Sequence, residues 1–135
     1  MANAIYAKAK EKFLSGTLDL TSVTVKAILI DTADYTYSAA HDFLDDVPGA
    51  ARVATSGALG SKTVTNGIFD AADVVFVAPS GDSVEAIIVY HDSGVESTST
   101  LLAYIDVAAS GLPITPNGTN LLLAWDNGGN GIFKL

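Results

Sequence analysis

The chain has 135 residues, which is enough for one compact domain and too few for two of ordinary size. Hydrophobic residues make up 49% of it and charged residues 16%, which excludes a disordered protein, because disorder needs low hydrophobicity and dense charge. The net charge of −8 is opposite to that of a nucleic-acid-binding surface, and no apolar run approaches the ~20 residues of a membrane span, so we expect neither partner.

The first predicted element is a helix from Asn3 to Leu14. Asn3 is a favoured N-cap residue, and Ser15-Gly16 supplies a C-terminal stop. A helix of about three turns is marginal alone in water, so it needs the body of the domain or a neighbouring subunit to dock against. We therefore expect residues 1–18 to form a helical arm and residues 19–135 a single β-sandwich domain. The apolar positions recur at a spacing of four, at Ile5, Ala9 and Phe13.

From residue 23 onward, short runs of branched and aromatic residues are separated by Gly, Asn, Asp and Ser, which is typical of β-strands. The predicted strands are Val23 to Ile30, Arg52 to Ser56, Lys62 to Phe69, Val74 to Ala78, Val84 to His91, Thr100 to Val107, Asn120 to Trp125 and Gly131 to Leu135. One helical turn is predicted from Ser38 to Asp45. The expected fold class is mainly β, a jelly-roll-like β-sandwich of about eight short strands with a short N-terminal helix.

Gly-containing pairs mark the connections between these strands, because such pairs supply the positive φ angles of tight turns. The last of these turns is expected to fold the C-terminal strand back on its neighbour in the sequence. The predicted turns are Ser80-Gly81-Asp82, Asp92-Ser93-Gly94, Ser110-Gly111, Pro116-Asn117-Gly118 and Asp126-Asn127-Gly128-Gly129.

Two of the predicted strands are apolar on both sides, Val84 to His91 and Thr100 to Val107. A sandwich with one wet face on each sheet would not need this. The N-terminal helix and long loops could cover the second face. Because a helix of this length cannot cover both sheets, we favour an interface with another subunit or partner.

The absence of cysteine from the sequence excludes disulfides, a thiolate nucleophile and zinc–cysteine sites. The seven basic residues are also unevenly placed, because no Lys or Arg occurs between Lys62 and Lys134. A partner that docks on the body of the domain is therefore expected to meet carboxylates, hydroxyls and apolar side chains.

The remaining candidates for catalysis or metal binding are weak. His41 and His91 could bind zinc with nearby carboxylates, but their separation in the sequence neither favours nor opposes this. The carboxylates of residues 42–46 could contribute to a calcium site, yet there is no D-x-D-x-D-G loop. A triad of a Ser with His91 and Asp106 lacks a nucleophile motif such as G-x-S-x-G. The sequence predicts no enzyme, no cofactor and no metal site.

Aromatic residues offer a hypothesis of sugar binding, because their faces stack on pyranose rings. At strand positions, however, aromatic side chains mostly pack in a core or against neighbouring strands. Sugar binding is therefore the weaker interpretation. The residues concerned are Trp125, Tyr35, Tyr37, Tyr90 and Tyr104.

A set of packing and turn motifs covers nearly the whole chain: Ile5-Tyr6, Phe13–Gly16, Val25–Asp34, His41–Val47, Ala51–Ala54, Gly111–Gly118, Trp125–Gly128 and Ile132–Leu135. In this combination the chain resembles a family of small virion structural proteins of tailed bacteriophages. The resemblance implies a capsid cement (decoration) protein that binds the major capsid protein on the outer head surface and stabilises the shell. It further implies a dimer or trimer that is made in the bacterial host cytoplasm and located in the virion.

We expect the N-terminal segment to contact the capsid or a neighbouring subunit through Ile5, Tyr6, Lys8, Lys12 and Phe13. The alternative function, from another class, is a phage tail or baseplate adsorption module that binds host surface glycans through Tyr or Trp. An enzyme is a distant third.

Overall fold

The computed structural model describes residues 3–108, 111–126 and 128–135. Within these residues the fold is mainly β, with sandwich-like layers and a short helix near the N-terminus, which confirms the expected class. Three short 3-10 helices lie at Leu44–Asp46, Gly49–Ala51 and Glu96–Thr98. The other elements are β1 (Ala4–Ile5), α1 (Ala7–Leu14), β2 (Val25–Ile30), β3 (Arg52–Thr55), β4 (Thr63–Thr65), β5 (Ile68–Asp70), β6 (Val74–Phe76), β7 (Ala86–His91), β8 (Leu101–Ile105), β9 (Leu121–Leu123) and β10 (Phe133–Lys134).

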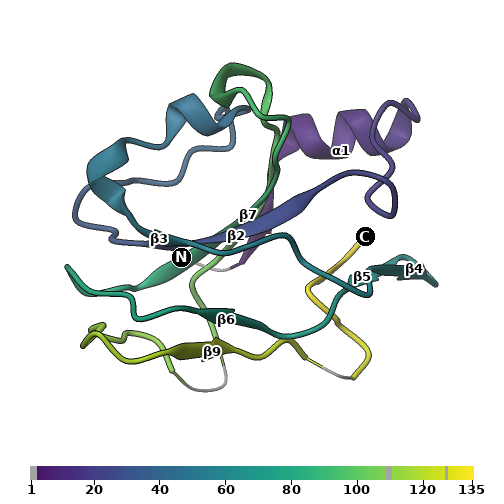
Figure 1. Cartoon of the computed structure of the whole chain (residues 1–135). Coiled ribbons are helices and arrows are strands. Elements are labelled where there is room, and N and C mark those ends of the chain that lie inside the picture. The colour runs from purple at the N-terminus through teal and green to yellow at the C-terminus, as the bar shows by residue number, and fades with distance from the viewer. Residues whose placement is uncertain (1–2, 109–110, 127) are drawn as a thin grey trace.

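The strands form three antiparallel sheets of unequal size. The largest has five strands in the order β1-β8-β7-β2-β3, and the smaller ones are β10-β5-β4 and β6-β9. Figure 1 shows α1 on one side of the five-stranded sheet and the β6-β9 sheet on the other. The layers are thus less regular than the two four-stranded sheets of a jelly roll. No helix within the described residues is long and apolar enough to cross a membrane.

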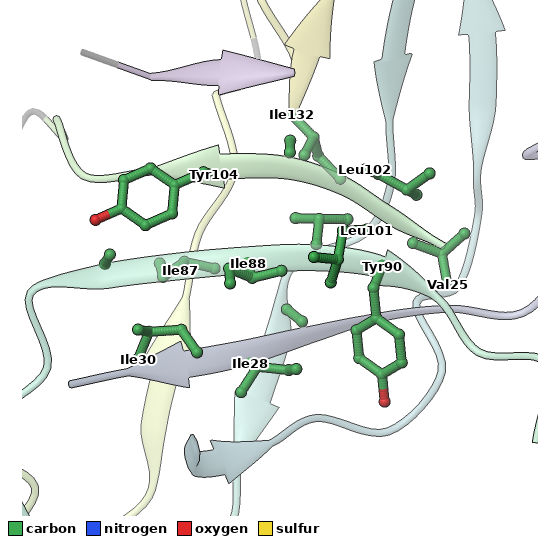
Figure 2. Packing of buried hydrophobic residues seen from close by; sticks show 14 of the residues in the cluster. Val25, Ile28, Ile30, Ile87, Ile88, Tyr90, Leu101, Leu102, Tyr104 and Ile132 are labelled. Atoms are coloured by element: carbon green, nitrogen blue, oxygen red, sulfur yellow. The ribbon is translucent and has the colours of Figure 1, made fainter. Parts of the chain in front are cut away.

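The five-stranded sheet is buried on both faces by the chain itself. The register aligns Ile28, Ile88 and Tyr104 on one face and Ala27, Val89 and Ala103 on the other. All six side chains are buried, and Figure 2 shows apolar side chains of this cluster from close by. The interface expected on the second face of these strands is therefore wrong. Sequence periodicity identified the two-sided burial correctly, but it could not show that loops and the small β6-β9 sheet would supply the cover.

The N-terminal segment begins as a strand, not as a helix. Ala4 and Ile5 pair with β8, and α1 starts only at Ala7. Asn3 is not the N-cap, because its side chain instead accepts hydrogen bonds from the backbone N–H groups of Asp106 and Val107 and donates one to the Val107 carbonyl. The predicted helix was therefore too long by one turn. An asparagine can cap a helix, but here the side chain of Asn3 holds the edge strand β1 against the end of β8.

Residues 4–18 belong to the main hydrophobic core rather than to a free arm. Tyr6 and Ala9 are fully buried, and Leu18 is nearly so. The Tyr6 backbone N–H donates to the Leu102 carbonyl, which extends the pairing of β1 with β8. Of the two docking partners that the sequence left open for this segment, the body of the domain is the one that it contacts here.

The predicted strand from Lys62 to Phe69 is in fact a hairpin. Asn66 and Gly67 both adopt positive φ angles, 55° and 78°, and turn the chain between β4 and β5. An Asn-Gly pair between apolar residues is the strongest short-range signal for such a turn, and it was overlooked. The turns predicted at Gly81, Gly94 and Gly118 do have the positive φ angles that they require.

The C-terminal strand is paired, but not with its neighbour in the sequence. β10 lies antiparallel to β5, with Phe133 opposite Phe69, so the expectation that it folds back on the preceding strand is wrong. Two of the predicted turns include Ser110 and Asn127, which lie outside the described residues. The helical turn predicted from Ser38 to Asp45 appears later, as the 3-10 helix Leu44–Asp46.

Candidate functional site

A groove of about 1110 Å³, which we call the edge groove, lies at one edge of the five-stranded sheet. One wall consists of residues 3–5, where β1 forms the edge of the five-stranded sheet, together with the end of β8. The opposite wall comes from residues 123–126 and 130–134, which include β10. Most of the lining is apolar, and residues 3–5 are more than 100 residues from residues 123–134 in the chain.

Trp125 lines the edge groove and carries an unpaired polar atom. Its backbone N–H donates to Asp73 Oδ1 at 2.9 Å, which ties Trp125 to the residue that precedes β6. The side chain is only 7% exposed, and its indole Nε1–H has no acceptor among the described residues. Leaving a buried donor unpaired costs about 1–3 kcal/mol, so this N–H lowers the stability of the fold locally.

Two lysines on the edge groove, Lys10 and Lys134, also lack a partner. Neither has a carboxylate within ion-pair distance or a hydrogen-bond acceptor in the part of the chain that the structure describes. The other five basic side chains are all engaged. Lys8 pairs with Glu11, Lys26 with Asp92 and Arg52 with Glu96, Lys12 donates to Thr100 Oγ1, and Lys62 donates to the Val23 carbonyl.

The five residues expected at an interface have different environments. Ile5 lines the edge groove, and Lys8 is exposed. Phe13 is half-buried and stacks on Phe133, with the ring centroids 6.0 Å apart. Lys12 is also held, because its Nζ lies 2.6 Å from Thr100 Oγ1 and 4.6 Å from the centroid of the Phe43 ring. The charge on Lys12 is therefore directed towards this protein's own surface.

Tyr6 cannot contact a partner, and its prediction as an interface residue is wrong. Its ring is fully buried, and its hydroxyl lies 2.9 Å from the Tyr35 hydroxyl. The Tyr35 hydroxyl in turn lies 2.8 Å from Nδ1 of His41. Burial raises the pKa of Tyr6 far above its ordinary value and that of Tyr35 to about 12, so both phenols stay protonated at neutral pH. The row of hydrogen bonds is thus a structural part of the core.

The aromatic residues considered for sugar stacking are mostly inside the protein. Tyr35, Tyr90, Tyr104 and Trp125 are each less than 10% exposed. Tyr37 is half-buried, lines the edge groove and packs against Tyr104, with the ring centroids 5.2 Å apart. An exposed aromatic platform is therefore not formed by this set.

The predicted metal ligands do not come together. No cluster of three potential ligands in the described segments includes His41, His91 or the carboxylates of residues 42–46. Burial and the nearby charge of Lys12 lower the pKa of His91, so its imidazole is neutral at pH 7. Asp46 is already used, because its Oδ2 accepts the backbone N–H of Asp42 at 2.9 Å.

A different acidic cluster forms where β2 ends and the connection between β6 and β7 turns. Carboxylate oxygens of Asp31, Asp34 and Asp82 all lie within 4.8 Å of one another. Asp31 is buried and accepts the Ala33 N–H at 2.9 Å, whereas the other two are exposed. Sequence analysis missed this cluster because Asp82 is about 50 residues away from the others, in a turn that was explained by its glycine alone.

Replacing Asp82 by asparagine is expected to raise the melting temperature by roughly 1–3 °C at low ionic strength, because it relieves repulsion among three close carboxylates. The gain should shrink in 1 M salt, where such repulsion is screened. Asp45→Asn is the matched control, since Asp45 is an exposed carboxylate outside the cluster. Equal gains from the two variants, measured by thermal unfolding, would attribute the effect to net charge and not to the cluster.

No model of a known protein family matches the chain, and no curated protein matches it either.

Proposed function

We propose that the chain is a structural virion protein of a tailed bacteriophage, a capsid cement protein that binds the major capsid protein on the outer head surface. The resemblance to small phage virion proteins along nearly the whole sequence supports this role. A net charge of −8 also suits a position outside the shell, away from packaged DNA. In this role the protein stabilises the shell and associates with itself as a dimer or trimer.

The observation that carries the proposal is an exposed apolar face on the β6-β9 sheet. Val75 and Leu122 lie directly opposite one another on its outer side, and Val77 follows on the same side of β6. They are 46%, 62% and 80% exposed, respectively. A two-stranded sheet is marginal by itself, and here it presents branched side chains outward. Such a face is typical of a surface that is covered on association.

A small apolar face is enough to stabilise a shell, because the same contact is repeated by every copy of the protein. Apolar burial contributes about 25 cal/mol for each Å² removed from water. A single copy therefore gains little from three side chains, but a shell that carries many copies gains that amount at every junction. Binding in this manner needs no catalytic group and no cofactor, and we propose none.

Sedimentation of the purified protein with empty capsids of its phage tests the proposal. The wild type should co-sediment at a fixed stoichiometry and raise the temperature at which the heads break. Leu122→Lys places a charge on the apolar face and should lower the bound fraction at least ~10-fold. Val95→Lys is the matched control, because Val95 is a similarly exposed valine in a separate loop. A wild-type protein that ignores capsids would contradict the cement role.

The second candidate is a tail or baseplate module that binds host glycans, and one observation favours it. Tyr37 is half-buried and lines the edge groove, where a sugar ring could contact it. A glycan array probed with the wild type and with Tyr37→Ala tests this function. Binding that is lost in the variant would favour adsorption, and a silent array would count against it.

A further inference from the structure

The two basic side chains that line the edge groove, Lys10 and Lys134, have no ion-pair or hydrogen-bond partner among the described residues. The indole N–H of Trp125 is also unpaired, but its nitrogen is buried in the wall of the groove. Asp126 on the same wall uses one carboxylate oxygen, Oδ1, to accept the Gly128 N–H at 2.8 Å. A ligand that pairs with both lysines must bring two acceptors that carry negative charge.

β1 adds an open strand edge to the same groove. The backbone N–H of Tyr6 donates to the Leu102 carbonyl, so Tyr6 directs its main-chain groups towards β8. Residues of an antiparallel strand alternate in this respect, and the preceding residue, Ile5, therefore directs its N–H and C=O away from β8. Neither group of Ile5 bonds to another described residue, and Ile5 lines the groove. An unpaired strand edge is a template for a further strand, which receives its register from main-chain hydrogen bonds.

Size and lining favour a peptide over other anionic ligands. A groove of about 1110 Å³ exceeds the ~300–1,000 Å³ that drug-sized ligands fill. Its walls are mostly aliphatic and aromatic, which suits apolar side chains better than the many hydroxyls of a glycan. The net charge of −8 opposes a densely charged ligand such as a polyphosphate more strongly than a segment with one or two carboxylates.

We propose that the edge groove binds an extended, apolar peptide segment with acidic side chains, which adds to β1 as a further strand. Main-chain groups of the segment pair with Ile5, and carboxylates bind Lys10 and Lys134. That the segment belongs to the major capsid protein rests on the proposed function. That the ligand is an acidic, extended peptide rests on the groove alone.

Selection from a display library of random eight-residue peptides on the full-length protein tests the ligand class without capsids. The enriched peptides should alternate apolar residues, carry Asp or Glu and exclude Lys. Their binding can be followed through the emission of Trp125, because it is the only tryptophan in the chain. An enriched set with no acidic preference would overturn the proposal.

Variants then locate the binding. Lys10→Glu and Lys134→Glu should each raise the Kd of an enriched peptide at least ~10-fold, whereas Lys8→Glu, also an exposed lysine of α1, should leave it unchanged. N-methylation of alternate peptide amides should abolish binding in one register only, as strand addition requires. Equal affinity for the wild type and both groove-lysine variants would refute the site.

Two further results separate this proposal from the capsid role. If the wild type binds capsids and Lys134→Glu binds them equally well, the capsid protein is not the partner of the groove, while the cement function stands. If enriched acidic peptides bind but capsids do not, the groove assignment stands and the partner is another protein. Binding of acidic glycans in place of peptides, dependent on Trp125, would overturn the peptide assignment.

Discussion

Tyr6→Ala is expected to lower the free energy of unfolding by about 3–5 kcal/mol, the usual cost of removing a large aromatic side chain from a core. The ring of Tyr6 is fully buried and lies 5.2 Å from that of Tyr37. The variant also leaves the Tyr35 hydroxyl without one of its two partners. Urea unfolding followed by far-UV circular dichroism measures the loss.

Two controls separate the ring from the hydroxyl and from the segment as a whole. Tyr6→Phe keeps the packing and removes one hydrogen bond, so it should cost only about 1 kcal/mol. Lys8→Ala changes an exposed side chain of α1 and should stay within ~0.5 kcal/mol of the wild type. If Tyr6→Ala proved as stable as Lys8→Ala, the N-terminal segment would be a free arm in solution and the docked arrangement would be incorrect.

Gly131→Ala is expected to be nearly as damaging, at about 2–5 kcal/mol, through backbone strain and overpacking together. Gly131 has a φ of +55°, in the left-handed region. A Cβ atom there would lie 2.6 Å from the Phe69 carbonyl oxygen and 2.7 Å from Cγ2 of Ile68. Relief requires β10 to move away from β5, which would break the pairing of Phe133 with Phe69.

Gly129→Ala is the matched control for this prediction. It adds the same methyl group two residues earlier, where a Cβ meets nothing within 4 Å and φ is not in the left-handed region. Its cost should be within ~0.5 kcal/mol. Thermal unfolding of both variants decides the matter, and similar melting temperatures for the two would show that β10 is not anchored in this manner.

The fold class could be predicted from sequence because buried strands show a characteristic pattern of apolar residues. β2, β7 and β8 carry apolar residues at nearly every position, and each was expected as a strand. The same signal could not show what covers the second face, because periodicity describes one element and not its neighbours. The 1-8-7-2-3 order follows from long-range pairing, for which a single sequence holds no direct signal.

The candidate site was much less predictable. Lys8 and Lys12 were expected to contact a partner because they lie on the polar side of a helix, yet Lys12 turns to Thr100 and Phe43. The edge groove joins residues from both ends of the chain, so no local motif marks it. The sequence holds one signal for the groove. Lys134 is the only cation after Lys62, and an isolated charge of this kind is a candidate for a specific contact.

The pairing of β1 with β8 also has a consequence for the order of events during synthesis. Ala4 pairs with Tyr104, so the first strand of the chain must wait for about a hundred further residues before its neighbour exists. At translation rates of roughly 5–20 residues per second, that delay is about 5–20 s. Until then, the apolar side chains of Ile5 and Tyr6 lack their cover in the sheet. The five-stranded sheet can therefore close only after β8 has been made, and β1 should be among the last strands to join it.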